Sequence, residues 1–157
     1  YPTSYIATTT TAVTRNADVL NVPVAGTIDY TVGTAYVEYS SSVLVGNKGI
    51  IGGTANSRTM VTDNKLRQWG YDGVTVANSP SGPSSEFLPV AAATAWGNNL
   101  VSYRNGVSGT VYSFDGEMEH AGSVVGLGYQ GSNYLDGTVR EVKIFDTELT
   151  AAEVGDL

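Results

Sequence analysis

The sequence contains no cysteine and few charged residues. Without cysteine there is no disulfide framework, no thiolate zinc site and no thiol nucleophile, so the hydrophobic core must stabilise the fold alone. Charged residues make up 15% of the 157 residues, against roughly 25% in an average soluble domain. Glycine, Thr, Ser, Val and Ala are abundant instead, which is typical of an all-β protein with many turns. The length predicts one domain over residues 1–157, with residues 1–20 as a leading segment.

Positive charge and long apolar runs are also scarce. The chain carries 8 Lys and Arg residues against 15 Asp and Glu, a net charge of −7, and it has no basic cluster. The longest apolar stretch, Leu88 to Trp96, falls well short of the roughly twenty residues that span a bilayer. We therefore expect neither a nucleic-acid partner nor membrane insertion. The opening YPTSYIATTT lacks a basic signal-peptide region and an initiating Met, so we expect a processed or excised piece of a longer protein.

Period-two alternation of apolar and polar residues, bounded by Gly, Asn and Asp, recurs along the chain and predicts strands. Within residues 34–41 it places Ala35, Val37 and Tyr39 on one face and Tyr36 and Glu38 on the other. Further strands are predicted within residues 19–24, 49–53, 58–62, 66–71, 73–77, 88–114 and 123–129, and in the closing segment 134–154, where Val142 and Ile144 share a face. No 20 to 50 residue repeat is present, so a solenoid or a propeller is disfavoured.

Three local signals refine this pattern. Asn105-Gly106 predicts a type I′ hairpin turn, because both residue types tolerate positive φ. Val139 is out of phase with Val142, so a β-bulge is expected near Arg140 and Glu141. The segment NSPSGPSSE, residues 78–86, is dense in turn formers and predicts a surface loop.

The carboxyl end predicts one short helix. Thr150 and Glu153 have the T-x-x-E spacing of a capping box, and Leu149 and Val154 occupy the two positions of a hydrophobic staple. We expect this helix to close the domain and to lie against a sheet edge.

Two segments resemble a known family. AATAWGNNLVSYRNGVSGT, residues 92–110, is similar to a hairpin of laminin G-like and pentraxin-like domains of the concanavalin A type, and LDGTVREVKIFDTELTAAEV, residues 135–154, resembles their closing strand and helix. The resemblance implies a two-sheet antiparallel β-sandwich, a concanavalin A-like jelly roll, with one short C-terminal helix. It also implies ligand-binding loops on one rim or on the concave face, and Trp96 in the core. It transfers no activity, because such folds serve lectins, adhesive modules and glycosidases alike.

The amino-terminal segment SYIATTTTAVTRNADVLNV is similar to one that precedes such domains in bacteriophage structural and tail-fibre proteins. This resemblance implies a virion location, with other virion proteins as partners and a homo-oligomeric assembly. Without this segment, a secreted or surface-displayed bacterial adhesive domain fits equally well.

The glycosidase branch of this fold needs two carboxylates on one strand face, roughly 5–5.5 Å apart for a retaining mechanism. In DGEMEH, residues 115–120, Glu117 and Glu119 have the two-residue spacing, but Met118 replaces the acid that the branch's motif has between them, and Gly116 favours a turn. His120 is the single histidine, and no Ser/His/Asp arrangement forms around it in the sequence. We therefore predict that the chain is not an enzyme.

Sugar binding requires aromatic faces together with amides or carboxylates. The sequence offers them in two places, RQWGYDG and GYQGSNYLDG. The glycan-binding candidates are Trp69, Tyr71, Tyr129, Gln130, Asn133 and Tyr134. For the two residues of the first group, a place in the core is an equal alternative.

No metal site is predicted. Calcium stays open as a cofactor, because domains of this type often bind it at a rim and it takes six to eight oxygen ligands. Asp63-Asn64, Asp72 and the group Asp115, Glu117 and Glu119 could contribute oxygens, although none has the spacing of a known ligand motif.

These observations lead to one prediction with two alternatives. The prediction is a non-enzymatic virion module, part of a phage fibre or capsid appendage, that displays a surface for host cell-surface glycans. The first alternative is a purely structural, self-assembling virion or extracellular filament or decoration protein that binds no sugar. An endo-glycosidase is the remote alternative.

Overall fold

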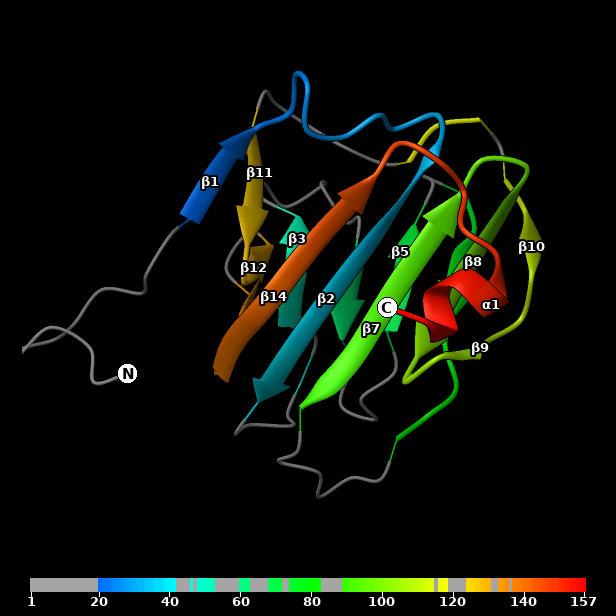
Figure 1. Cartoon of the computed structure of the whole chain (residues 1–157). Coiled ribbons are helices and arrows are strands. Elements are labelled where there is room, and N and C mark those ends of the chain that lie inside the picture. The colour runs from blue at the N-terminus through cyan, green and yellow to red at the C-terminus, as the bar shows by residue number, and fades with distance from the viewer. Residues whose placement is uncertain are drawn as a thin grey trace, which may run out of the picture.

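The computed structural model describes residues 20–41, 46, 48–52, 60–62, 68–71, 74–82, 89–114, 116–118, 124–130, 133–135 and 137–157. Two antiparallel sheets pack face to face in these residues, as the front and back layers of Figure 1 show. The predicted all-β sandwich is therefore confirmed.

The first sheet has six described strands, of which the last four follow one another in the sequence. In spatial order they are β1 (Leu20–Pro23), β11 (Val124–Leu127), β3 (Lys48–Gly52), β4 (Met60–Thr62), β5 (Gln68–Tyr71) and β6 (Val76–Asn78). A two-stranded ladder of β12 (Tyr129–Gln130) and β13 (Asn133–Tyr134) lies beside β3.

The second sheet is more regular and contains the two longest strands. Its described order is β10 (Tyr112–Ser113), β8 (Asn99–Arg104), β7 (Val90–Trp96), β2 (Gly33–Ser41) and β14 (Gly137–Phe145), and β9 (Val107–Ser108) also pairs with β8. Asn105 and Gly106 connect β8 to β9 with φ values of 49° and 76°, as a type I′ turn requires. The β2–β14 register shifts between Val139 and Glu141, which confirms the predicted bulge.

The core between the sheets follows the alternation seen in the sequence. Ala35, Val37 and Tyr39 of β2 are fully buried in it, and Trp96 at the end of β7 is fully buried as well. Ile50 and Ile51 of β3 both enter this core, because the ladder between β3 and β4 also has an irregularity at this point.

The helix α1 (Ala151–Gly155) begins with the predicted capping box. The Thr150 side chain accepts a hydrogen bond from the Glu153 N–H, and the Glu153 carboxylate accepts one from the Thr150 N–H at 2.8 Å. The expected position at a sheet edge is wrong. Val154 is buried in a second apolar cluster with Tyr36 and Tyr103, so the helix covers the outer face of the second sheet.

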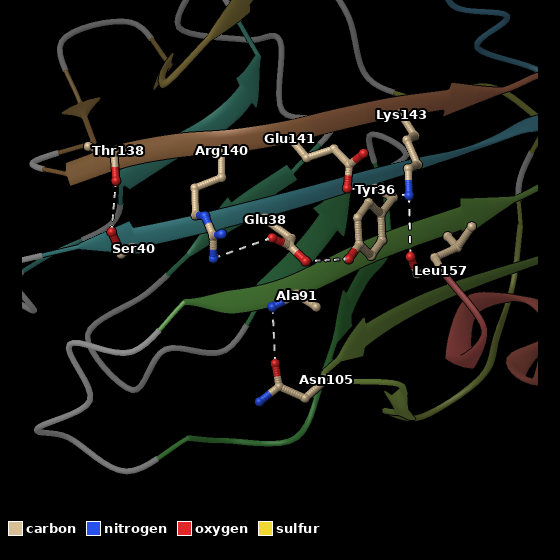
Figure 2. A network of polar contacts seen from close by, with 10 residues as sticks. All are labelled: Tyr36, Glu38, Ser40, Ala91, Asn105, Thr138, Arg140, Glu141, Lys143 and Leu157. Carbon is tan, nitrogen blue, oxygen red and sulfur yellow. Dashed lines mark hydrogen bonds and ion pairs between the residues drawn. The ribbon is translucent and has the colours of Figure 1, made fainter. Parts of the chain in front are cut away.

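Polar contacts between side chains of β2 and β14, drawn in Figure 2, cover another part of this outer face of the second sheet. Glu38 accepts a hydrogen bond from the Tyr36 hydroxyl at 3.3 Å and pairs with Arg140 at 3.7 Å. Lys143 pairs with Glu141 at 3.3 Å, and its Nζ lies 5.1 Å from the centre of the Tyr36 ring. Tyr36, which alternation places away from the main core, is thus buried by the helix and this network instead of facing solvent.

Among the described residues, no helix is long and apolar enough to cross a membrane.

Candidate binding site

A chain of three adjoining hollows runs along one end of the sandwich, where β14 and β7 end and β2 and β8 begin. The first has a volume of about 820 Å³ and the other two about 450 Å³ each. Thr31 lines both the first and the second hollow, and Asn98 and Glu148 line both the second and the third. We call this continuous surface the rim groove. Each hollow lies within the roughly 300–1,000 Å³ range of small-molecule sites.

The wall of the first hollow is the loop between β1 and β2, which hydrogen bonds hold in place. The Thr31 N–H and hydroxyl both donate to Asp29 Oδ1, at 2.8 and 2.7 Å. The backbone oxygen of Asp29 accepts from Trp96 Nε1 at 2.9 Å, and the oxygen of Tyr30 accepts from the Met118 N–H at 2.8 Å. The loop is therefore fixed to the core at two points. The hydrogen bonds from Thr31, first that of its hydroxyl, lower the pKa of Asp29, so this carboxylate is ionised at neutral pH.

Glu148 organises the middle of the groove. Its carboxylate accepts hydrogen bonds from the Asn98 N–H at 2.6 Å, and from the N–H and the side-chain amide of Asn99 at 3.2 Å each. Gly97 permits this approach, because a Cβ there would lie 2.9 Å from Glu148 Oε2. The turn between β7 and β8 and the segment after β14 are thereby joined.

Thr34 of β2 binds the segment after β14 through its side chain. Its hydroxyl donates to the Thr147 carbonyl at 2.8 Å and accepts from the Leu149 N–H at 2.9 Å, and the residue is fully buried. The segment after β14, which crosses the top of the molecule in Figure 1 on its way to α1, is therefore tied to β2.

The third hollow opens onto the outer face of the second sheet beside the start of α1. Tyr103 of β8 lines it together with Ser108, Thr150 and the exposed Val111. Burial, and to a smaller extent the charge of Glu148, raise the pKa of Tyr103 above its usual 10.0. The Tyr103 hydroxyl therefore keeps its proton and stays a hydrogen-bond donor at neutral pH.

Taken together, the groove presents hydroxyl, amide and carboxylate groups. Exposed side chains at its lining include Asn98, Asn99, Asp146 and Glu117. These are donors and acceptors of the kind that bind sugar hydroxyls. Tyr30 and Tyr103 also line it, but they are 6% and 5% exposed and offer little ring surface for stacking.

The glycan-binding candidates from the sequence lie elsewhere, in two groups. Tyr129 pairs with Tyr134, and Gln130 with Asn133, in the β12–β13 ladder, where Tyr134 is 37% exposed.

The second group lies on β5. Tyr71 is half-buried and pairs with the exposed Val76, and Trp69 pairs with Asn78. The strand β4 separates β5 from β3, so β5 lies about 10 Å from β3 at the usual strand spacing, and the β12–β13 ladder contacts β3.

Neither group belongs to the rim groove. In the sequence, the β12–β13 ladder ends at Tyr134, shortly before β14 starts at Gly137. The groove is instead lined by residues at the other end of β14, around Phe145. Nine residues of strand put about 27 Å between these two ends. A small glycan cannot contact both.

Of the groove residues, Glu117 is the one that the sequence suggests as a glycosidase carboxylate or a calcium ligand, while Leu149 and Thr150 are predicted there only as parts of the helix start. The described residues 116–118 form a bend and not a strand, with Glu117 exposed and Met118 only 1% exposed in the core. Met118 is therefore a packing residue at the place where the glycosidase motif has an acid. Glu119 and His120 lie outside the described residues.

Calcium was left open by the sequence. Within the described part of the chain, no three His, Asp or Glu side chains are grouped so that they could hold a metal ion. Asp63, Asn64, Asp72, Asp115 and Glu119 lie outside that part.

No protein-family model matches the sequence, and no curated protein matches it either. Solved structures with the same fold do match. The CBM40 domain of the Ruminococcus gnavus IT-sialidase, solved with α2,6-sialyllactose, superposes with a TM-score of 0.64 at 11% identity, over 81% of this chain and 82% of that one. A heptameric SAP-like pentraxin from Limulus polyphemus gives 0.59 at 12% identity, over 80% and 69%.

A leech intramolecular trans-sialidase also matches, with a TM-score of 0.60 at 15% identity over 81% of this chain. This chain spans only 23% of that enzyme. At these identities the comparisons show the fold alone: a β-sandwich jelly roll consistent with the concanavalin A-like type. Of these three structures, the CBM40 domain and the pentraxin are matched over most of their own length, 82% and 69%.

Proposed function

We propose that this chain is a non-enzymatic glycan-recognition module that binds sugars in the rim groove. The observation that carries the proposal is the continuity of the three hollows across the rim, with Asn98 and Glu148 shared between two of them. An extended groove of fixed hydroxyl, amide and carboxylate groups suits an oligosaccharide chain. The fold supports the same function, since the CBM40 domain that it resembles was solved with a bound sialyllactose.

The proposal extends to the setting of the module. The amino-terminal segment resembles those of phage tail-fibre proteins, so we place the module on a virion, as part of a fibre or capsid appendage that faces host glycans. A secreted or surface-displayed bacterial adhesive domain is the alternative setting. Of the segment that carries this resemblance, residues 4–22, the part up to position 19 lies outside the described part of the chain.

A glycan array with the purified domain, run in calcium and again in chelator, tests the function. Saturable binding to a defined bacterial surface glycan supports it, and loss of that binding in chelator would add a metal to the site. Absence of binding to every bacterial glycan, under both conditions, would contradict it.

Two matched variants test the location. Asn98→Ala removes an exposed groove amide while it keeps the backbone N–H that donates to Glu148. Tyr134→Ala removes the exposed ring of the β12–β13 ladder. We expect the first change to weaken binding about tenfold and the second to leave it unchanged. The reverse result would move the site to the ladder, where the sequence placed it.

Self-assembly is the second candidate function, and one feature favours it. β14 ends the described order of the second sheet and is nine residues long. Glu141 and Lys143 lie on one face of it, on either side of Val142. If two copies paired their β14 edges antiparallel about Val142, Glu141 of each copy would lie opposite Lys143 of the other, a favourable cross-strand pair.

Light scattering distinguishes this candidate. Glu141→Lys would place like charges opposite each other and dissociate such a dimer, and the double variant E141K/K143E would restore it. A monomer at all concentrations, or a dimer indifferent to Glu141→Lys, would eliminate β14 pairing.

A further inference from the structure

We infer that the rim groove selects uncharged glycans and rejects sialylated and other anionic ones. The inference rests on the proposed function and specifies its ligand class. It departs from the CBM40 domain of similar fold, which was solved with a sialylated ligand.

The first step is the charge of the groove lining. Four carboxylates line the three hollows, namely Asp29, Glu117, Asp146 and Glu148, and none of the described lining residues is Lys, Arg or His. The remaining polar groups of the lining are neutral amides and hydroxyls. An anionic sugar would therefore meet negative charge along the described lining, where no cation is present to pair with its carboxylate.

The second step is that Arg140 and Lys143, two described cations of the second sheet, already pair with carboxylates and lie on another surface. Arg140 pairs with Glu38, and Lys143 pairs with Glu141 and donates to the Leu157 carbonyl at 3.2 Å. Figure 2 shows these contacts on the outer face of β2 and β14. Neither side chain lines the groove, so neither offsets its charge.

The third step is the charge of Asp29 and of the chain as a whole. Hydrogen bonds from Thr31 lower the pKa of Asp29, so this carboxylate is ionised at neutral pH. The net charge of −7 for the whole chain adds repulsion at longer range. Neutral sugars avoid this repulsion and use the same carboxylates as acceptors for their hydroxyls.

The test compares matched pairs of glycans on one array, each neutral oligosaccharide beside the same chain capped with sialic acid. We expect the sialylated member to bind at least tenfold more weakly at low salt, with a smaller difference at 0.5 M NaCl because salt screens the exposed carboxylates. The double variant E117Q/D146N removes two of the exposed charges and should narrow the difference severalfold. The double variant E141Q/D156N removes two charges outside the groove lining and serves as the matched control.

Three results have distinct meanings. A sialylation penalty that shrinks in E117Q/D146N and not in the control supports the inference. Equal or tighter binding of sialylated members overturns the inference and leaves glycan recognition standing. Absence of binding to any glycan of either kind overturns the proposed function, and the inference with it.

Discussion

The two hydrogen bonds of the Thr34 hydroxyl, which we call the Thr34 clamp, join β2 to the segment 147–149 of the groove wall, and a single substitution tests their contribution. Thr34→Val keeps the shape of the side chain but removes a hydroxyl that donates to the Thr147 carbonyl at 2.8 Å and accepts from the Leu149 N–H at 2.9 Å. Thr34 itself is fully buried, while the two backbone groups belong to a segment that is partly exposed. Leaving such groups without their partner costs about 1–2 kcal/mol in total, because water can replace part of what is lost.

For a domain of this size, that loss lowers the melting temperature by roughly 2–8 °C, measured by calorimetry or circular dichroism. Thr138→Val on β14 is the matched control, since Thr138 is exposed and its hydroxyl bonds with Oγ of the half-buried Ser40 at 2.9 Å. Its effect should stay within about 0.5 kcal/mol.

Binding gives a second readout of the same clamp. Because residues 147–149 form part of the groove wall, Thr34→Val should also weaken glycan binding, whereas Thr138→Val should not. If the two variants melted at the same temperature and bound equally well, the clamp would have no role and the reasoning would be refuted.

The remaining predictions concern the helix and the glycines. Val154→Ala removes two buried carbon atoms from the contact between α1 and the second sheet. It should lower the free energy of unfolding, measured in urea, by about 1.5 kcal/mol. An unchanged urea midpoint would show that α1 does not contribute to stability. Gly137→Ala should strongly destabilise the protein, because the added Cβ would overlap the Ser40 carbonyl oxygen. Gly155→Ala should be neutral or stabilising, because no atom lies within 4 Å of the Cβ that it would add. Equal effects of the two variants on stability would contradict the β2–β14 packing. The pKa of Glu153 is lowered by hydrogen bonds from Thr150, so its contribution to stability is present above pH 4.5 and is lost as pH falls through the lower folded pKa. The melting-temperature difference between wild type and Glu153→Gln should accordingly shrink from pH 6 to pH 3, and a constant difference would exclude this linkage.

The features that could be predicted from the sequence are those encoded by a few neighbouring residues. The type I′ turn at Asn105-Gly106 follows from the φ preferences of two residues, and the capping box of Thr150 and Glu153 from their spacing. The bulge after Val139 follows from a break in alternation. Each of these needs no knowledge of the tertiary fold.

The rim groove could not be predicted in the same way. Its residues come from separate segments of the chain between Gly26 and Ala151, among them those around Asp29, Asn98, Glu117 and Glu148. The strand order of the second sheet and the hydrogen bonds of Glu148 bring them together. The sequence offered a partial signal, since GNN and DTE are polar segments that flank predicted strands, but alternation alone does not say which strand ends share a rim.

The burial of Tyr36 shows the same limit. Alternation correctly placed it on the face opposite to Ala35 and Val37, yet that face is covered by α1. The period of a strand identifies its two faces. Whether the second face meets water depends on where a helix more than a hundred residues later comes to lie.

The most direct test of glycan recognition at the rim groove is an NMR titration of the ¹⁵N-labelled domain with a neutral oligosaccharide that the array identifies. We predict saturable shifts that centre on the backbone amides of Asn98, Asn99, Thr147 and Glu148, with the amides of the β12–β13 ladder unchanged. Shifts centred on that ladder or on Trp69 and Tyr71, with the rim unchanged, would contradict the location of the site. No shifts at saturating sugar would contradict glycan recognition itself.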